Sequence, residues 1–474
     1  MKKITLFLMM TILFTNGYSQ QKKITYPKAK KTDVTDLYFG TAVADPYRWL
    51  EDDNSKETAQ WVKAENKVTE TYLQQIPFRE EIKNRLTTLW NYPKYSVPFR
   101  KGNYYFFSKN NGIQNQSVLY IQQGLNGEPR VFLDPNALSA DGTTALATYK
   151  ASADGSYFAY AIAKAGSDWN EIYVMETSTG QLLSDKLEWV KFSDIAWKDK
   201  GFYYSRYDKP GEGGELSSKN EFKKVYYHKV GDDQSKDQLI YENKLEPLRS
   251  YGAQTTSDED FLAIFETEST SGNALYIKDL RKKESSFIKI ADGFRYDYEI
   301  VTNYGERFII RTNDGAPRYR LIAVELSNPG REAWETVVPE QAEVLQSAYP
   351  GGGMLICQYM KDATSKASVY HADGSLMHEI ALPEPGTIND FESAREDGQA
   401  FFSFTSFTSP STIYKYDIAS NRSEVFHQSA LGFNTEGIVS EQVFYTSKDG
   451  TRIPMFLVHR ADIQMDGNNP VYLY

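Results

Sequence analysis

A sequence repeat constrains the fold of this chain more than any other feature. Seven times, an aromatic strand pattern is followed by a polar loop and a strand with an aliphatic–aromatic pair. The equivalent positions are 44 to 54 residues apart: Tyr120, Tyr173, Tyr227, Tyr276, Ile322, Tyr370 and Tyr414. This period is typical of a four-stranded propeller blade with variable loops. One blade cannot bury both of its faces, so we expect the seven to close into a ring rather than form a long array of β-sandwiches.

The segments on either side of the repeats carry different patterns. Before them, Asn54 followed by Glu57 indicates a helix start, and helical spacing of apolar residues continues to Leu89. After them, two strands are predicted around a hairpin turn at residues 449–450, and residues 471–474 predict a third. These three strands have no eighth blade to join, so we expect them to begin a second domain.

The N-terminus has the pattern of a secretory signal peptide. Lys2 and Lys3 precede an apolar stretch at residues 4–14, and Gly17 and Ser19 are small residues at the spacing that a signal peptidase recognises. The apolar stretch is too short to span a bilayer. We therefore expect cleavage after Ser19 and export to the periplasm or the medium, with no membrane anchor after cleavage.

Composition excludes some classes of function. The net charge of -10 argues against a nucleic-acid partner, because nucleic acids select basic surfaces. Cys357 is the only cysteine, so no intramolecular disulfide can form. It lies in an apolar strand pattern, and we expect it to be buried rather than reactive.

The residues alone reveal no catalytic centre. There is no G-x-S-x-G motif, no P-loop and no pair of histidines with metal-ligand spacing. His228, His371 and His427 lie in or beside repeat strands, where we expect structural roles. Acidic pairs leave a propeller glycosidase open, because sequence cannot show the distance between two carboxyl groups. The residues alone therefore predict an exported propeller that serves as a binding or gating module without a catalytic centre of its own.

Long, specific motifs run through nearly the whole chain after the N-terminal segment. They are "DPYRWLED" (45–52), "YPKYS" (92–96), "GIQNQSVLY" (112–120), "VKFSDIAW" (190–197), "FTSFTSP" (404–410) and "YTSKDGTRIPMFLVH" (445–459). Through them the chain resembles the prolyl oligopeptidase family of serine peptidases, and the prolyl endopeptidases within it most closely. In that family a propeller is inserted between two parts of an α/β-hydrolase domain and caps the active site.

The resemblance and the repeats together imply a mainly β chain with four parts. These are a signal peptide (1–19), an N-terminal segment of the hydrolase domain (20–90), a seven-bladed β-propeller (91–430) and the first strands of the α/β-hydrolase domain (431–474). The family's oxyanion-hole tyrosine and its catalytic serine, aspartate and histidine would follow Tyr474. No catalytic residue is therefore assigned here, and we expect an incomplete copy that is inactive alone.

One substrate-binding residue is implied by the resemblance. The family's "KFS" segment before a tryptophan supplies a phenylalanine to the proline-side pocket, and here that residue is Phe192. An aromatic ring can pack on a proline ring or on an adjacent side chain. From the residues alone, a core position for Phe192 is the alternative.

The implied function is that of a serine endopeptidase that cleaves short proline-containing peptides after proline. In the family the propeller keeps large folded proteins out, and no metal or cofactor is implied. We expect a monomer. Two alternatives stay open: a propeller that is complete as a binding or scaffold module, and a sibling oligopeptidase that prefers another residue, such as a basic one.

Overall fold

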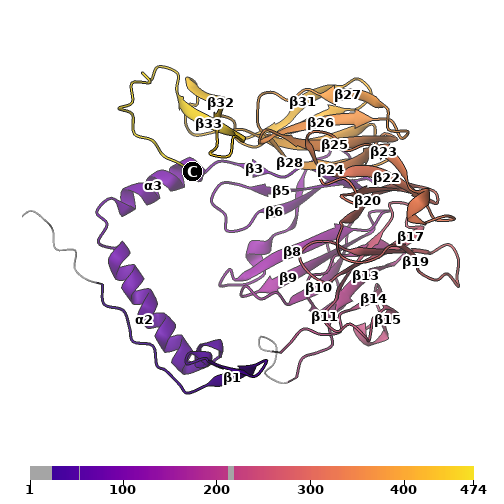
Figure 1. The fold of residues 1–474 in the computed structure, drawn as a ribbon, viewed down its shortest axis with the longest axis horizontal. Coiled ribbons are helices and arrows are strands. Elements are labelled where there is room, and N and C mark those ends of the chain that lie inside the picture. Colours follow the sequence, from indigo (N-terminus) through magenta and orange to yellow (C-terminus); the bar gives the residue numbers. More distant parts are fainter. Residues whose placement is uncertain (1–23, 53, 212–217) are drawn as a thin grey trace, which may run out of the picture. The chain divides into compact units, whose positions relative to one another are not determined.

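The computed structural model describes residues 24–52, 54–211 and 218–474. The predicted signal peptide lies outside these residues. The chain divides into two compact units, residues 1–87 and 88–474 (Figure 1). No helix in the described part of the chain is both long and apolar enough to cross a membrane.

The shorter unit holds a hairpin followed by helices. Its elements are β1 (Thr35–Tyr38), β2 (Thr41–Ala44), the 3-10 helix η1 (Arg48–Glu51), α2 (Lys56–Leu73) and most of α3 (Arg79–Trp90), whose last three residues belong to the longer unit. The Ser55 hydroxyl caps α2 by accepting the backbone N–H of Thr58 at 3.0 Å, so the helix begins one residue later than predicted. Arg48 forms ion pairs with Asp36 and Asp45, which tie η1 to the hairpin.

The longer unit contains four sheets of four antiparallel strands, each in chain order. The first sheet consists of β16 (Ser250–Thr255), β17 (Phe261–Thr267), β18 (Ala274–Asp279) and β19 (Ile288–Ala291). The second consists of β20 (Tyr298–Tyr304), β21 (Arg307–Thr312), β22 (Arg320–Glu325) and β23 (Glu335–Val338). The third sheet consists of β24 (Val344–Gly351), β25 (Met354–Lys361), β26 (Thr364–Tyr370) and β27 (Leu376–Ile380). The fourth consists of β28 (Thr387–Glu392), β29 (Gln399–Thr405), β30 (Thr412–Asp417) and β31 (Arg422–Gln428).

Two larger sheets precede these four in the chain. The five-stranded sheet contains β3 (Lys94–Tyr95), β4 (Phe99–Lys101), β5 (Tyr104–Asn110), β6 (Val118–Gln123) and β7 (Arg130–Leu133). The eight-stranded sheet contains β8 (Thr144–Ala151), β9 (Tyr157–Lys164), β10 (Asn170–Glu176), β11 (Leu182–Val190), β12 (Ala196–Lys198), β13 (Gly201–Arg206), β14 (Lys224–Lys229) and β15 (Gln238–Tyr241). Short 3-10 helices lie in three loops: η2 (Pro135–Ala137), η3 (Gln234–Lys236) and η4 (Arg331–Ala333).

The predicted count of seven blades is wrong. Val190 at the end of β11 pairs with Arg206 of β13, so the strands expected to form the second and third blades make one continuous sheet. The described strands of the propeller therefore form five separate blades and one eight-stranded sheet. The spacing of a repeat shows where strands occur, but it does not show whether the last strand of one unit pairs with a strand of the next. The prediction therefore missed the pairing of β11 with β13.

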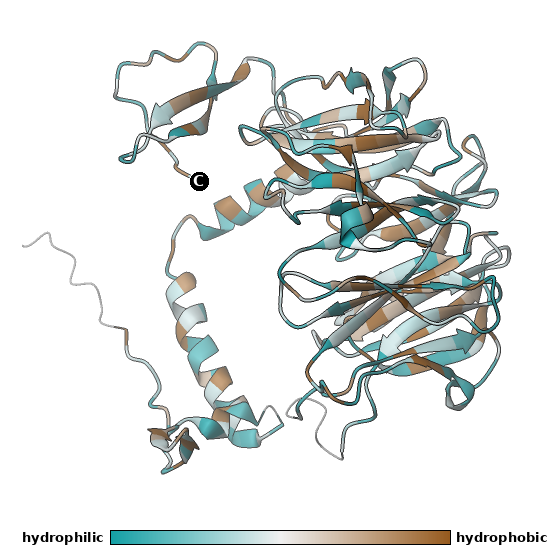
Figure 2. Cartoon of the chain, turned by 45° about the vertical axis from the view of Figure 1, so that its right-hand side comes forward, coloured by the Kyte–Doolittle hydropathy of each residue, from teal (hydrophilic) through white to brown (hydrophobic). Residues whose placement is uncertain are grey.

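Adjacent sheets pack through aromatic and aliphatic side chains, and Figure 2 shows hydrophobic positions along their strands. Phe261 of β17 meets Phe308 of β21 edge to face, with ring centroids 5.1 Å apart. Phe106 of β5 stacks on Phe158 of β9 at 5.4 Å. Such strands are apolar on both faces because each sheet is covered on both sides.

The first and last sheets of the propeller also meet. Tyr95 of β3 stacks on His427 of β31 with ring centroids 4.7 Å apart, and the Ser429 hydroxyl donates to the carbonyl oxygen of Pro93 at 2.6 Å. Arg100 of β4 forms an ion pair with Asp397, which precedes β29. Side-chain contacts between the ends of the repeat thus close the ring.

The segment after the propeller forms the predicted hairpin but not the predicted third strand. β32 (Ile438–Thr446) and β33 (Arg452–Arg460) pair with each other. Residues 471–474 form no strand, and the side chain of Tyr472 is exposed. A β-strand needs a neighbour for its backbone hydrogen bonds, and none of the described strands lies beside this segment.

Candidate functional site

Phe192 lies in the loop of residues 191–195, which connects β11 to β12. Its side chain is 67% exposed, so it does not belong to the hydrophobic core. Its backbone φ is +51°, in the left-handed region that non-glycine residues rarely adopt. This conformation costs on the order of 1 kcal/mol and persists only where neighbouring contacts hold it.

Those contacts come from Lys223, which precedes β14, and from Ser205 of β13. The Lys223 ammonium, immediately before β14, donates to the carbonyl oxygen of Phe192 at 2.5 Å and to the hydroxyl of Ser250 in β16 at 3.0 Å. The Ser193 hydroxyl accepts the backbone N–H of Ser205 in β13 at 2.7 Å. The loop is therefore anchored at Phe192 itself and at the residue that follows it.

Lys223 is an unusual lysine because only 2% of it is exposed. Burial lowers the pKa of its ammonium to about 8, although the nearby carboxylate of Asp194 acts in the opposite direction. A buried amine must be satisfied by acceptors, since leaving it unpaired costs several kcal/mol, of the order expected for an unsatisfied charged group. The carbonyl of Phe192 is one of its two acceptors, which couples the loop to the interior of the sheet.

A second lysine, Lys191, contacts the ring of Phe192 and also that of Trp169. The Lys191 ammonium lies 5.5 Å from the centroid of the Phe192 ring and 5.1 Å from that of Trp169, and 3.6 Å from the Asp168 carboxylate. Trp169 contacts Trp189 edge to face at 5.7 Å. Cation–π contacts of this kind restrict side chains while leaving an apolar ring exposed.

The histidines have structural partners. His228 is fully buried between two carboxylates, with Nδ1 2.7 Å from Asp237 and Nε2 3.0 Å from Asp185. His378 Nε2 lies 2.7 Å from the hydroxyl of Tyr416. Over residues 24–52, 54–211 and 218–474, no histidine side chain is hydrogen-bonded to a serine side chain, and no group of three or more His, Cys, Asp or Glu could hold a metal ion.

Cys357 is completely buried, as predicted. Burial raises the pKa of its thiol to about 12. The thiolate, which is the nucleophilic form, is therefore negligible at neutral pH.

Sequence reasoning singled out Phe192 but missed Lys223. The signal was present in the alternation of "FKKVYYH": Lys223 lies two residues before buried Val225 and so shares its inward face. A lysine at an inward position of a strand needs a buried acceptor, which here is the loop that carries Phe192.

The hairpin after the propeller contacts two propeller loops. Phe456 of β33 lies against Phe407 of the "FTSFTSP" loop, with ring centroids 5.1 Å apart, and the Gln442 side chain of β32 donates to the carbonyl oxygen of Asp362. Glu384 holds the loop by accepting the hydroxyls of Ser406 and Ser409 at 2.6 and 2.7 Å. The motif therefore serves to present Phe407 to β33.

Known proteins resemble the chain in both sequence and structure. It is 44% identical over 452 residues to the prolyl endopeptidases of Elizabethkingia meningoseptica and Elizabethkingia miricola, covering 95% of this chain and 64% of each relative. A solved prolyl endopeptidase, from a study of inter-domain dynamics, superposes with a TM-score of 0.85 at 33% identity, covering 94% of this chain and 66% of that one.

A second solved structure is prolyl oligopeptidase B from Galerina marginata, bound to a 35mer hydrolysis and macrocyclization substrate. It has a TM-score of 0.83 and 29% identity, covering 94% of this chain and 66% of that chain. Residues 26–429 match the family described as prolyl oligopeptidase, N-terminal beta-propeller domain. The chain therefore belongs to the prolyl oligopeptidase family, whose N-terminal propeller domain it contains.

Proposed function

We propose that this chain is the N-terminal and propeller part of an exported prolyl oligopeptidase, a serine endopeptidase that cleaves short peptides after proline. The observation that carries the proposal is the 44% identity to two prolyl endopeptidases over 95% of the chain. The chain spans 64% of the length of those relatives, and we place the catalytic serine, histidine and aspartate in the remainder.

In this proposal the propeller contributes to substrate binding through Phe192. Its ring is exposed, and Lys223 fixes the backbone that carries it. A proline ring or a neighbouring peptide side chain would pack on the Phe192 ring and lose contact with water. The remainder of the propeller would restrict access to short peptides.

The chemistry of the complete enzyme would be acyl transfer. The serine oxygen attacks the carbonyl carbon of the proline while the histidine takes the serine proton, and the histidine then gives that proton to the leaving amine of the next residue. Water releases the peptide acid in a second cycle of the same steps. None of the described residues in this chain is assigned to these steps.

We further propose that the protein is a monomer that is exported after cleavage behind Ser19. The support for export is the order of charged, apolar and small residues in positions 1–19. N-terminal sequencing of the protein recovered from outside the cytoplasm should begin at Gln20 or Gln21. A sequence that begins at Met1 would contradict export by this route.

The proposed specificity can be tested with the protein encoded by the complete gene. We expect it to release chromophore from a Gly-Pro p-nitroanilide, and not from the matching Gly-Ala or Gly-Arg compounds. Preference for Gly-Arg would indicate a sibling oligopeptidase. No cleavage of any of the three by a folded, complete protein would indicate a binding module.

A further inference from the structure

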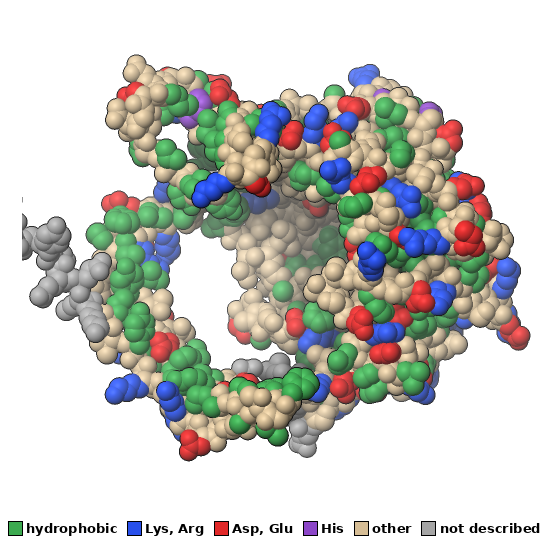
Figure 3. All heavy atoms as spheres, viewed as in Figure 1, with side chains coloured by type: hydrophobic (Ala, Val, Ile, Leu, Met, Phe, Trp, Pro, Cys, Tyr) green, Lys and Arg blue, Asp and Glu red, His purple; other side chains and the backbone are tan. Residues whose placement is uncertain are grey.

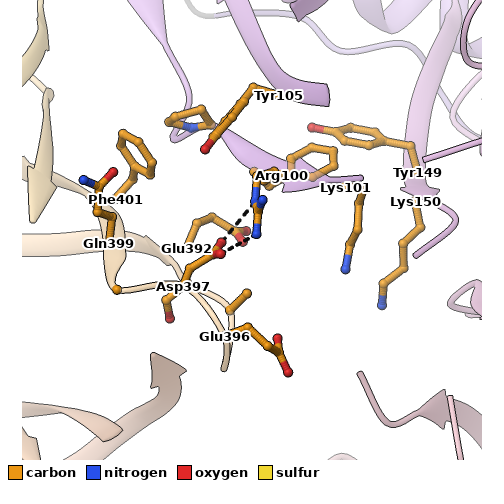
Figure 4. A pocket seen from close by; sticks show the side chains of 15 residues that line it. Arg100, Lys101, Tyr105, Tyr149, Lys150, Glu392, Glu396, Asp397, Gln399 and Phe401 are labelled. Carbon is orange, nitrogen blue, oxygen red and sulfur yellow. Dashed lines mark hydrogen bonds and ion pairs between the residues drawn. The ribbon is translucent and has the colours of Figure 1, made fainter. Parts of the chain in front are cut away.

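The propeller has a cavity at the end of its first strands, away from Phe192. The cavity has a volume of about 590 Å³, within the usual range for small-molecule sites. Lys101 ends β4, Lys150 lies next to the end of β8, and Glu392 ends β28, so charged side chains from three sheets line the cavity (Figure 4). Arg100, Glu396 and Asp397 line it as well.

This cavity and the Phe192 loop are at opposite ends of the first strands. Ser250, which is hydrogen-bonded to Lys223 beside Phe192, begins β16, whereas Thr255 ends it and lines a second cavity of about 220 Å³. That second cavity shares Lys101 and Lys150 with the first. A six-residue strand is roughly 20 Å long, so a ligand in these cavities would not touch Phe192.

The two lysines have no partner. In the described part of the chain, neither the Lys101 nor the Lys150 ammonium has a hydrogen bond or an ion pair. The other cations of the same wall are engaged: Arg100 pairs with Asp397, and Arg395 pairs with Glu396. Figure 4 shows the two lysine side chains next to each other and pointing the same way.

Lys101 is half-buried and Lys150 is exposed, and both share the cavity with the carboxylate of Glu392. Burial and the charge of Lys150 lower the pKa of Lys101, although carboxylates including Glu392 oppose the shift. Burial, together with the charge of Asp390, raises the pKa of Glu392 against the opposing effect of the lysines. An anion between the two ammonium groups would relieve their repulsion, whereas Glu392 would compete with it.

We propose that Lys101 and Lys150 form a binding site for a small dianion, such as a phosphate group that carries an organic body. Two unpaired ammonium groups match a charge of two, and ammonium–phosphate contacts are strong charge-assisted hydrogen bonds. Tyr149 and Phe401 line the same cavity and provide apolar surface for the organic body. The net charge of -10 makes general attraction of anions weak, so saturable binding requires a local site.

The test uses phenyl phosphate as the probe and titration calorimetry on the full chain at pH 8. We expect saturable binding of one equivalent, with weaker binding of inorganic phosphate, which lacks the ring, and none of phenol, which lacks the charge. Lys101→Met and Lys150→Met should each weaken binding by about tenfold or more, the loss expected for one charged hydrogen bond. Lys101→Arg and Lys150→Arg should retain it.

Glu392→Gln should strengthen binding, because it removes the competing carboxylate without changing the side-chain shape. Lys200→Met serves as the control, since Lys200 is exposed and lies outside the cavity. Melting curves establish that each variant is folded. Equal binding of phenol, or unchanged binding in a folded Lys101→Met/Lys150→Met double variant, would overturn the proposal, as would absence of any binding by the folded parent chain.

Discussion

The exposed ring of Phe192 is held in place by the buried side chain of Lys223. The ring is positioned by a backbone in the left-handed region, and the carbonyl of the same residue accepts the hydrogen bond from Lys223. An exposed ring held in this way is already ordered before a ligand arrives. Less conformational entropy is then lost on binding, which is the physical benefit of preorganisation.

Replacing Phe192 should therefore affect binding rather than folding. In the complete enzyme, we expect Phe192→Ala to weaken peptide binding by roughly 1 to 3 kcal/mol, the range for an aromatic contact residue. The free energy of unfolding should hardly change because the ring is exposed. Leu376→Ala, at an exposed position of β27, is the control. Loss of several kcal/mol of stability with unchanged KM would identify Phe192 as structural.

Lys223 should act through Phe192. We expect Lys223→Met to raise KM about three- to tenfold, which corresponds to on the order of 1 kcal/mol for one hydrogen bond, with kcat nearly unchanged. Methionine fills a similar volume without a buried charge, so the melting temperature should be maintained. Combining it with Phe192→Ala should add little, because both changes remove the same positioned ring. Fully additive effects would refute the coupling.

Single residues could be predicted where the local pattern determines their environment. The apolar strand around Cys357 predicted its burial, which is confirmed. The partners of His228 could not be predicted, because Asp185 lies 43 residues earlier in the sequence and the pairing depends on how β11 and β14 meet. Lys101 and Lys150 likewise share a cavity only after the sheets close into a ring.

Among the elements, the eight-stranded sheet has a buried charged link across its strands. His228 of β14 lies between Asp185 of β11 and Asp237, the residue before β15. Burial alone would lower the pKa of His228, but the hydrogen bonds to both carboxylates outweigh it and raise the pKa to about 9. The charged imidazolium therefore connects the two repeat units that merge in this sheet.

The raised pKa makes stability depend on pH. The folded chain holds the His228 proton more tightly than the unfolded chain, whose histidine has a pKa of 6.5. This contribution, about 3 kcal/mol at most, is fully present below pH 6.5 and is lost as pH rises toward 9. Above pH 8, the lowered pKa of Lys223 acts in the opposite sense.

Urea unfolding between pH 6 and 8 measures the effect. Burial lowers the pKa of His378 and His427, which makes stability rise with pH in the parent and in His228→Gln alike. We therefore expect His228→Gln to be less stable than the parent at pH 6, and the difference between the two to shrink toward pH 8. His371→Gln should retain the slope of the parent. A difference between parent and His228→Gln that is constant or grows with pH would contradict a charged His228.

At least one turn also packs closely against the neighbouring blade. Gly374, between β26 and β27, has a φ of +86°, and a Cβ there would lie 1.8 Å from the carbonyl oxygen of Val337 in β23. Gly293 has a similar φ of +79°, but a Cβ would meet nothing within 4 Å. Gly293→Ala is thus a matched control that carries the backbone strain without the clash.

We expect Gly374→Ala to lower the free energy of unfolding by about 1 to 3 kcal/mol more than Gly293→Ala does, because the neighbouring blade must move. Chemical denaturation of both variants provides the comparison. Equal losses of unfolding free energy in the two variants would mean that backbone strain dominates and that the neighbouring blade can shift to accommodate the methyl group.

Secondary-structure elements could be predicted where neighbouring residues in the sequence determine them. The turn at Asp449 and Gly450 marked the hairpin of β32 and β33, which is confirmed. Residues 471–474 have strand composition but no partner strand, so the composition alone misled. The merger of two units depends on the pair Val190–Arg206, a tertiary contact with no local signature.

At the scale of the whole molecule, the repeat positions and the sheets agree only in part. The seven repeat positions all fall on described strands, from Tyr120 in β6 to Tyr414 in β30. Periodicity thus predicted a ring of antiparallel sheets, but the number of separate blades follows from long-range pairing. The count is five blades and one eight-stranded sheet.

Apolar side chains remain exposed outside the propeller. Figure 3 shows hydrophobic side chains along the helices. The side chains of Val62, Ile82 and Leu86 are exposed. Met455 and Val458 of β33 are similarly exposed. Patches of this kind commonly mark interaction sites. Under the proposed function, they would be covered by the rest of the hydrolase domain.

Labelling with a fluorophosphonate probe tests the central proposal most directly, because the probe reacts only with activated serines. Two proteins are compared, residues 20–474 and the product of the complete gene, each also assayed with the Gly-Pro substrate. We predict that only the complete protein is labelled and active, and that its labelled serine lies beyond residue 474. Specific labelling of a serine within residues 20–474 would contradict the account and place an active site in the propeller itself.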